Sequence, residues 1–331
     1  MYKIIIYIGR EKYTYKKIPF DIYLKACIFN SFNKNEILAW IFFGLNDWNQ
    51  ISKKIPNNQS SYFHLQRRVG WPECQKIKAL LSNKKNLYDF VFSKEIIPKY
   101  IIINKIQKTF PSWVEQALMN EGLIIKPNSG YGGKDIFHYF FKDKKLFSKN
   151  LITQKKNNIY FEKNKLESIL KNWRINTKSK DFPLLTPYIK NPDCFPKSLD
   201  SVNIRVITNK KNKNSKAYLT YCWLEIPLQT GNLFISQNGL LLNIFNKEIS
   251  KTLKKNIDEW ITAVTENSKL LKDIEFSIEN SKNLHNFLSE IDSVAWDWIP
   301  SANLPKLLEG NSDFGFFIPQ LIDHINKKIY N

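Results

Sequence analysis

The sequence predicts an α+β protein whose strands pair mainly with antiparallel neighbours. Short runs rich in β-branched and aromatic residues are separated by brief turns, and segments with apolar residues at helical spacing lie between them. Around residues 123–141 a strand, a glycine-rich turn and a second strand follow one another, which is typical of a β-hairpin. Apolar residues make up 43% of the 331 residues, so a sizeable core is feasible.

The first 81 residues predict an N-terminal α/β or helical region. Residues 3–8 have the composition of a short strand, and residues 20–45 carry apolar side chains at helical spacing. Residues 56–61 are rich in Pro, Asn and Ser, which indicates a loop.

Residues 82–190 predict a second region of mixed helices and strands. Ser82 is the expected N-cap of a helix that stops before Pro98. Further helices are expected at 112–120 and 166–173, and strands at 99–103, 123–126, 136–141 and 184–189. The polar and basic stretch 142–158 indicates loop or strand edges.

Residues 191–331 predict the third region. Strands are expected at 202–208, 217–226, within 233–245, and at 294–299 and 306–308, and helices at 250–271, 281–288 and 318–330. A basic turn at 210–216 joins the first two strands, and no internal repeat is visible.

The charge of the chain favours anionic partners without choosing among them. There are 50 Lys and Arg against 30 Asp and Glu, a formal net charge of +20. Such a balance suits nucleotides, nucleic acid, acidic polysaccharide or an anionic membrane face. Because Lys, Asn and Ile are all abundant, a compositional bias explains the charge equally well.

Cysteine usage and hydropathy indicate a cytoplasmic protein. The four cysteines are scattered without a CxxC pair, which suits reduced thiols better than a disulfide framework or a zinc site. The apolar run at residues 4–8 is too short for a signal peptide or a membrane span, so we expect no transmembrane segment.

The glycine-rich turn is the first candidate site. Gly130, Gly132 and Gly133 lack a Cβ, so their backbone can approach phosphates and donate N–H groups, and Lys126 and Lys134 add positive charge. The turn is neither a Walker A sequence nor a dinucleotide fingerprint, because the spacing fails and no helix follows. A purely structural turn is an equally good interpretation of these residues alone.

The C-terminal hairpin is the more specific candidate. Asp297 and Glu309 lie symmetrically about Asn303, so a hairpin in that register makes them cross-strand neighbours on one face. Two adjacent carboxylates repel unless a proton or cation lies between them, and oxygen ligands suit Mg²⁺. Asn311 follows on the same face as Glu309. The alternative is an exposed hairpin with solvated acids, which the neighbouring Trp296 makes less favourable.

Two further cationic positions are candidates. Alternation in the strand at 202–208 places Asn203 and Arg205 on one face, where Arg205 can hold a phosphate or a developing negative charge. Lys84 stands at an expected helix start. For each the alternative is an ordinary solvated side chain. The histidines show no ligand spacing, and neither a nucleophile triad nor an RNA-binding aromatic motif is present.

Taken in order, these elements resemble the ATP-grasp superfamily, and in particular its sugar-transfer-associated branch, which is linked to polysaccharide biosynthesis. The matching segments lie between residues 82 and 315 and are Asn83-Lys84, Ile97-Pro98, Lys126-Pro127 with the loop at 130–133, the hinge strand 184–189, Asn203-Ile204-Arg205, Asp297, and Glu309-Gly310-Asn311. The chain departs from the family pattern at Asn83, at Thr186-Pro187 and at Gly231-Asn232, where the family commonly has acidic residues or paired glycines.

The resemblance implies an ATP-grasp fold in which two α+β lobes clasp ATP after a mostly helical N-terminal region. The implied domains are residues 1–81, a small lobe at 82–190 with the glycine-rich loop, and a large lobe at 191–331 with the Mg²⁺ site. The implied ATP-binding residues are Lys84, Lys126, Ser129, Gly130, Gly132, Gly133, Leu185, Thr186, Tyr188 and Ile189; the implied metal ligands are Asp297, Glu309 and Asn311; the implied catalytic residues are Arg205 and Lys126.

The function expected from this resemblance is an ATP- and Mg²⁺-dependent carboxylate ligase. Family chemistry forms an acyl-phosphate that an amine or another nucleophile attacks, which requires positioning and charge neutralisation rather than a protein nucleophile. The expected partners are ATP, a small or sugar-linked carboxylate, and an amine or hydroxyl acceptor. The alternatives are kinase-like phosphoryl transfer on the same fold, a basic nucleic-acid-binding protein, which the lack of a binding motif disfavours, and a non-catalytic nucleotide binder.

Overall fold

The computed structural model describes residues 2–8, 11–18, 75–103, 110–129, 135–151, 156–159, 165–177, 179–193, 195, 202–228, 231–236, 241–243 and 266–312. The chain divides into two compact units, one made of Met1–Val69 with Asp313–Asn331 and the other of Gly70–Ser312. In the first unit, β1 (Tyr2–Ile8) pairs antiparallel with β2 (Glu11–Ile18). The strand predicted at 3–8 is therefore present, while the segments predicted at 20–45, 56–61 and 318–330 lie outside the described residues.

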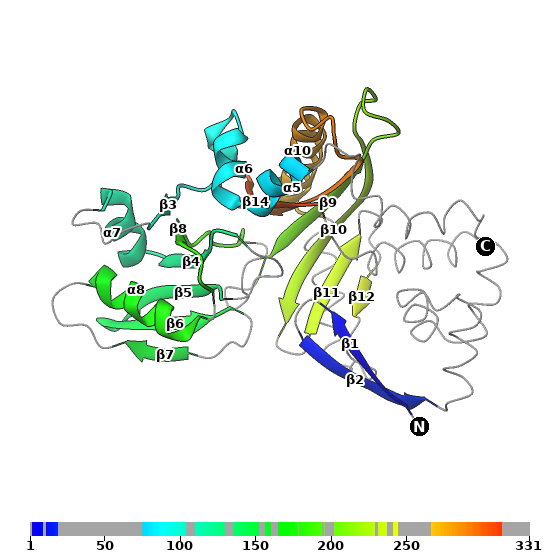
Figure 1. The fold of residues 1–331 in the computed structure, drawn as a ribbon. Coiled ribbons are helices and arrows are strands. Elements are labelled where there is room, and N and C mark those ends of the chain that lie inside the picture. Colours follow the sequence, from blue (N-terminus) through cyan, green and yellow to red (C-terminus); the bar gives the residue numbers. More distant parts are fainter. Residues whose placement is uncertain are drawn as a thin grey trace. The chain divides into compact units, whose positions relative to one another are not determined.

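The second unit contains two six-stranded sheets, which we call the N-terminal sheet and the C-terminal sheet (Figure 1). The N-terminal sheet has the order β3-β8-β4-β5-β6-β7, and every neighbouring pair is antiparallel. Its strands are β3 (Ile101–Ile102), β4 (Leu123–Pro127), β5 (Phe137–Lys142), β6 (Lys145–Asn150), β7 (Lys156–Ile159) and β8 (Pro183–Pro187). Helices α7 (Ser112–Met119) and α8 (Lys165–Asn176) contact it and share one apolar core with it.

The C-terminal sheet has the order β12-β11-β10-β9-β13-β14 and is also antiparallel throughout. Its strands are β9 (Asn203–Asn209), β10 (Tyr218–Leu228), β11 (Gly231–Ser236), β12 (Leu241–Asn243), β13 (Ser293–Ile299) and β14 (Lys306–Asn311). Helices α5 (Gln75–Ser82), α6 (Lys84–Phe90) and α10 (Ser268–Asn286) contact it, and a short 3-10 helix, η2 (Lys94–Ile96), contacts β14. The α+β class with antiparallel sheets, predicted from the sequence, is confirmed.

Strand β8 belongs to both apolar cores of this unit. The side chain of Leu184 packs in the core of the C-terminal sheet, whereas the next side chain, Leu185, packs in the core of the N-terminal sheet. This follows from the alternation of side chains along a strand. The strand predicted at 184–189 is thus present, although it ends at Pro187.

The start of α6 differs from the prediction by one residue. Ser82 is the last residue of α5, and its hydroxyl donates to the carbonyl oxygen of Ala79. Asn83 is extended, and its side chain accepts a hydrogen bond from the backbone N–H of Asn86 at 3.0 Å. Asn83, rather than Ser82, is therefore the N-cap, because the chain leaves the helical conformation only at residue 83.

Helix α10 is continuous where the sequence predicted separate helical segments. Its buried face includes Asp273, Ser277, Ser281 and His285 beside apolar residues. Polar residues on the buried face obscured the helical pattern in the sequence. Two of the serines form hydrogen bonds there: Ser277 donates to the Asp273 carbonyl at 2.7 Å, and Trp298 Nε1 donates to Ser281 Oγ at 2.9 Å. The part of the predicted helix before residue 266 lies outside the described residues.

The polar stretch at 142–158, expected to be loop or strand edges, contributes β6 and β7. These strands are stabilised by backbone pairing, of β6 with β5 and of β7 with β6, since their own sequence has few apolar residues. Among the helices that the structure describes, none has both the length and the apolar character needed to cross a bilayer.

Candidate functional site

Three cross-strand neighbours on the C-terminal sheet form the base of the candidate site. On β13, Asp297 lies opposite Glu309 of β14 on one side and opposite Arg205 of β9 on the other. The pairing of Asp297 with Glu309, predicted from the symmetry about Asn303, is therefore present, although the register shifts by one residue between Asp297 and Trp298. All seven residues of β13 are buried, so Asp297 lies in a largely desolvated position.

The carboxylates of Asp297 and Glu309 share a single amide. Asn311 Nδ2 lies 3.2 Å from Asp297 Oδ2 and 3.1 Å from Glu309 Oε1. On the other side of Asp297, Arg205 Nη1 lies 3.1 Å from Oδ1, and Asn203 Nδ2 donates to Oδ1 at 3.1 Å. Arg205 and Asn203 thus face the acidic pair, as the alternation along their strand predicted.

Gly310 allows this hairpin to pack against α5. A Cβ at this position would lie 2.8 Å from Leu81 Cδ2 and 3.1 Å from Trp296 Cζ3. Leu81 and Trp296 are both buried, so there is little room for a side chain between Glu309 and Asn311. The glycine in Glu309-Gly310-Asn311 therefore has a packing reason.

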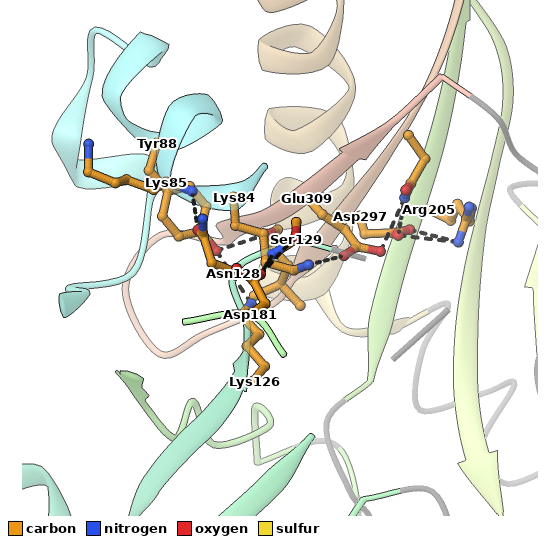
Figure 2. A network of polar contacts seen from close by, with 12 residues as sticks. Lys84, Lys85, Tyr88, Lys126, Asn128, Ser129, Asp181, Arg205, Asp297 and Glu309 are labelled. Carbon is orange, nitrogen blue, oxygen red and sulfur yellow. Dashed lines mark hydrogen bonds and ion pairs between the residues drawn. The ribbon is translucent and has the colours of Figure 1, made fainter. Parts of the chain in front are cut away.

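Two lysines from distant parts of the sequence complete the site (Figure 2). Lys84 is the first residue of α6, and its Nζ lies 3.5 Å from Glu309 Oε2. Lys126 lies near the end of β4 and is 5% exposed, as is Lys84. Its Nζ lies 3.5 Å from the hydroxyl of Tyr88, which donates to the Leu308 carbonyl at 2.8 Å.

Asn128 is the residue that holds α6 against the end of β4. Its backbone carbonyl accepts from Lys84 N at 2.9 Å, and its Oδ1 accepts from Lys85 N, also at 2.9 Å. These are N–H groups of the first turn, which have no partner within the helix. The two contacts align the N-terminus of α6 with β4 and so place the side chains of Lys84 and Lys126 beside the same carboxylate pair.

The two acidic side chains differ in their electrostatic environment. Burial raises the pKa of Asp297 to about 7; Glu309 adds to this rise, while Arg205 opposes it. Burial also opposes ionisation of Glu309, but Lys84 and Asn311, with other nearby cations, lower its pKa to about 2. Glu309 therefore carries a negative charge at neutral pH, and Asp297 is a carboxylate that a further cation would stabilise.

Lys126 is the cation most affected by its surroundings. Burial lowers its pKa to about 7, and the charge of Lys84 acts in the same direction, against the attraction of Glu309 and Asp297. An anionic group placed between the two lysines would stabilise both ammonium ions. The site thus favours a ligand with several negative charges.

The glycine-rich loop is only partly described. Ser129 is described, whereas Gly130, Gly132 and Gly133 lie outside the described residues. The backbone N–H and the hydroxyl of Ser129 both donate to Asp181 Oδ2, the latter at 2.8 Å, and Phe182 N donates to Asp181 Oδ1 at 2.8 Å. Asp181 therefore ties the start of the loop to the residues that lead into β8.

Of the predicted hinge residues, Leu185 and Thr186 lie within β8, and Tyr188 and Ile189 follow it. Leu185 pairs with β3 on one side and β4 on the other, so its backbone takes part in the sheet. The N–H of Tyr188 donates to the Gly122 carbonyl at 2.9 Å, and its ring stacks on His138 with centroids 4.1 Å apart. Thr186 is buried, while Tyr188 and Ile189 are half-buried.

Sequence reasoning missed Tyr88, Asn128 and Asp181. Asn128 follows Pro127 directly and Asp181 precedes the hinge strand by two residues, so each has the type and place of a loop residue that bonds to backbone. Their partners are 43 and 52 residues away in the chain. Tyr88 resembles any core aromatic of an amphipathic helix, and no sequence signal distinguishes it.

Comparison with known proteins finds similarity only at the level of solved structures. No protein-family model matches the chain, and neither does any curated protein. Matching structures include a D-alanine–D-alanine ligase from Bacillus anthracis complexed with ATP, with 12% identity, a TM-score of 0.40, and coverage of 75% of this chain and 61% of that chain.

Two further matching structures are a ribonucleotide synthetase and a ribonucleotide synthase. N5-carboxyaminoimidazole ribonucleotide synthetase from Thermotoga maritima has 10% identity, a TM-score of 0.36, and coverage of 71% of this chain and 42% of that chain. Carboxyaminoimidazole ribonucleotide synthase from Aspergillus clavatus, complexed with ATP, has 9% identity and a TM-score of 0.38, and the match covers 74% of this chain and 48% of that chain. This chain therefore spans about half the length of these structures. The function of the chain has to be argued from its own residues.

Proposed function

We propose that the protein is an ATP- and Mg²⁺-dependent ligase of the ATP-grasp superfamily that joins a carboxylate to an amine. The observation that carries this proposal is the meeting of Lys84, Lys126 and Arg205 around the Asp297–Glu309 pair. Three cations around the buried Asp297 and the half-buried Glu309 leave positive charge that an anion can neutralise, and a triphosphate supplies that negative charge.

The donor set fits Mg²⁺ held together with phosphates. Asp297, Glu309 and Asn311 offer carboxylate and amide oxygens, the ligands that Mg²⁺ prefers. Among the residues that the structure describes, no group of three or more His, Cys, Asp or Glu surrounds a common point. Two carboxylates and an amide suit an ion that takes its remaining ligands from substrate phosphates and water. A cation here would also oppose the effect of burial on Asp297.

Each of the chain's own residues has a role in this proposal. Lys84 and Lys126 hold the phosphates of ATP, and Asn128 keeps the two lysines together. Arg205, anchored by Asp297, faces the phosphoryl group as it moves from ATP to the substrate carboxylate, with release of ADP. When bound, Mg²⁺ neutralises charge on the phosphates. The amine nitrogen then attacks the acyl carbon, and inorganic phosphate leaves.

The biological setting is part of the same proposal. The family resemblance of the sequence favours a sugar-linked carboxylate in polysaccharide biosynthesis, acted on in the cytoplasm. The basic composition of the chain agrees with an acidic glycan or a nucleotide-linked sugar as substrate.

Calorimetric titration of ATP, with and without Mg²⁺, tests the nucleotide site. We expect binding by the wild type to require Mg²⁺, and we expect Glu309→Ala to weaken it at least tenfold, which is about 1.4 kcal/mol. The matched control is Glu275→Ala, because Glu275 is an exposed glutamate on α10. Absence of Mg²⁺-dependent ATP binding by the wild type would refute the proposal.

The reaction class is tested by trapping. With ATP, Mg²⁺ and a panel of carboxylates, hydroxylamine converts an acyl-phosphate into a hydroxamate, which a kinase acting on hydroxyl groups does not produce. Formation of ADP together with a phosphorylated alcohol, and without hydroxamate, would support the kinase alternative instead.

A further inference from the structure

Tyr88 lies beside the two lysines of the site, and packing alone does not explain its hydroxyl (Figure 2). It follows Lys84 by one turn of α6, so the two side chains project from the same side of the helix. Its ring is fully buried in the apolar core of the C-terminal sheet, with its centroid 5.1 Å from that of Tyr100. Phenylalanine would fill the same space without a polar atom to bury, so the hydroxyl requires a reason of its own.

The hydroxyl contacts a strand of each sheet. It donates to the carbonyl oxygen of Leu308 on β14 at 2.8 Å, and it lies 3.5 Å from Nζ of Lys126 on β4. A hydroxyl has one proton, so donation to the carbonyl leaves its oxygen as the acceptor for the ammonium group. Leu308 directly precedes Glu309, so this oxygen links Lys126 to the strand that carries a proposed metal ligand.

Lys126 depends on this contact more than Lys84 depends on Tyr88. Lys84 Nζ has the carboxylate of Glu309 at 3.5 Å, whereas Lys126 Nζ donates to the neutral hydroxyl of Tyr88 within the described part of the chain. Burial opposes the charged form of Lys126, and an acceptor at hydrogen-bond distance favours that form. Since an ammonium group has three N–H donors, the contact with Tyr88 leaves two for the oxygens of a ligand.

We propose that Tyr88 is a positioning residue that holds the ammonium group of Lys126 in place for the phosphates of ATP. This assignment rests on the ligase function proposed above and adds a residue to its phosphate-binding group. A lysine side chain has several rotatable bonds, and ordering it costs conformational entropy. A side chain that Tyr88 already holds loses less entropy when ATP binds, so the affinity for ATP is higher.

The competing interpretation is a tyrosine whose hydroxyl only stabilises the core. Both interpretations expect Tyr88→Phe to lower the free energy of unfolding, because both remove the hydrogen bond to Leu308. Only the positioning role makes the effect of Tyr88→Phe on ATP binding depend on Lys126. A double-mutant cycle, in which each substitution is made with and without the other, measures this dependence.

Calorimetric titration of Mg²⁺-ATP into the full-length protein provides the cycle, with wild type, Tyr88→Phe, Lys126→Met and the double variant. We expect Tyr88→Phe to weaken binding about fivefold when Lys126 is present. When Lys126 is replaced, we expect a change of less than about twofold.

The matched control is Tyr139→Phe. Tyr139 is also fully buried, and its hydroxyl donates to Asn172 Oδ1 at 3.1 Å, but its ring packs in the core of the N-terminal sheet. Loss of this hydroxyl removes a buried hydrogen bond of the same kind. We expect Tyr139→Phe to lose stability in urea unfolding and to bind Mg²⁺-ATP like the wild type.

A second readout does not require ATP. In NMR spectra of protein isotope-labelled at lysine Cε, the Lys126 signal is identified by its absence from Lys126→Met. We expect Tyr88→Phe to shift this signal and Tyr139→Phe to leave it unchanged, because only the first removes the contact with Nζ. If the wild type does not bind Mg²⁺-ATP, the proposed function fails, while this signal still decides whether Tyr88 holds Lys126.

Three results would overturn the assignment. They are wild-type affinity for Mg²⁺-ATP in Tyr88→Phe, an equal loss of affinity with and without Lys126, and an unchanged Lys126 signal in Tyr88→Phe. Urea unfolding checks that each variant folds. If Tyr88→Phe does not fold, the nuclear Overhauser effect between the Tyr88 ring and the Cε protons of Lys126 in the wild type decides, and its absence would overturn the assignment.

Discussion

Acidification should destabilise the C-terminal sheet through His285, a fully buried side chain of α10. Trp296 Nε1 donates to Thr208 Oγ1 at 2.9 Å, and Thr208 Oγ1 lies 2.8 Å from His285 Nδ1. His285 Nε2 lies 3.1 Å from the Ile291 carbonyl. A neutral imidazole protonated on Nε2 completes this chain, because Nε2 then donates to the Ile291 carbonyl and Nδ1 accepts from the threonine hydroxyl.

The size of the effect follows from linkage. Burial lowers the pKa of His285 from 6.5 to about 4, and Lys210 acts in the same direction. As the pH falls, His285 therefore binds a proton near pH 6.5 in the unfolded chain but only near pH 4 in the folded chain. Stability is lost as the pH falls through this window, by about 3 kcal/mol in full and about 2 kcal/mol by pH 5.

Urea unfolding measures this loss. Wild type and His285→Gln are compared at about pH 7.5 and about pH 5, and the difference between their pH dependences isolates His285 from the other titrating groups. We expect the wild type to lose about 2 kcal/mol more than the variant between these two pH values. Equal losses in the two proteins would refute the reasoning, because they would show that His285 has the same pKa in the folded and unfolded chains.

Three further substitutions test the scaffold of the site. Asn128→Ala removes the acceptor of Lys85 N. We expect the variant to be about 1 kcal/mol less stable in urea unfolding and to bind Mg²⁺-ATP more weakly in calorimetry. An unchanged ATP affinity would contradict the role given to Asn128. Gly122 has φ +102°, and a Cβ at this position would clash with the Tyr139 carbonyl oxygen. We therefore expect Gly122→Ala to lower the free energy of unfolding, measured with urea, by more than about 2 kcal/mol. A loss below about 0.5 kcal/mol would show that the backbone relaxes freely. Asp181→Ala leaves Ser129 without its acceptor. We therefore expect proteases to cleave the variant faster than the wild type near residue 130. Equal cleavage rates would argue against Asp181 as an anchor of the loop.

Much of the fold was readable from the sequence because its signals are local. The strands at β4, β5, β9, β10 and β13 have compact β-branched and aromatic runs bounded by turn residues. The polar strands β6 and β7 and the polar buried face of α10 were not readable from the sequence. Backbone pairing of β6 with β5 and of β7 with β6 stabilises the two strands, and side-chain hydrogen bonds such as that from Trp298 to Ser281 stabilise the polar face of α10.

The acidic half of the site follows from sequence alone. Asp297 and Glu309 are joined by one short hairpin, and a two-residue periodicity fixes which side chains share a face. The same alternation placed Asn203 and Arg205 on one face of β9. In each case the information lies within a few residues of the side chain concerned.

The cationic half was decided by tertiary structure. Lys84 and Lys126 come together because two oxygens of Asn128, the backbone carbonyl and the side-chain amide, accept hydrogen bonds from the N–H groups of the first turn of α6. The hydrogen bond from Lys85 N joins residues that are 43 positions apart in the chain. Likewise Asn203 reaches Asp297, 94 residues further along the chain, only because β9 pairs with β13. Local patterns determine which face of a strand a side chain occupies, whereas the partner across a gap depends on how separate elements pack, and no local pattern encodes that.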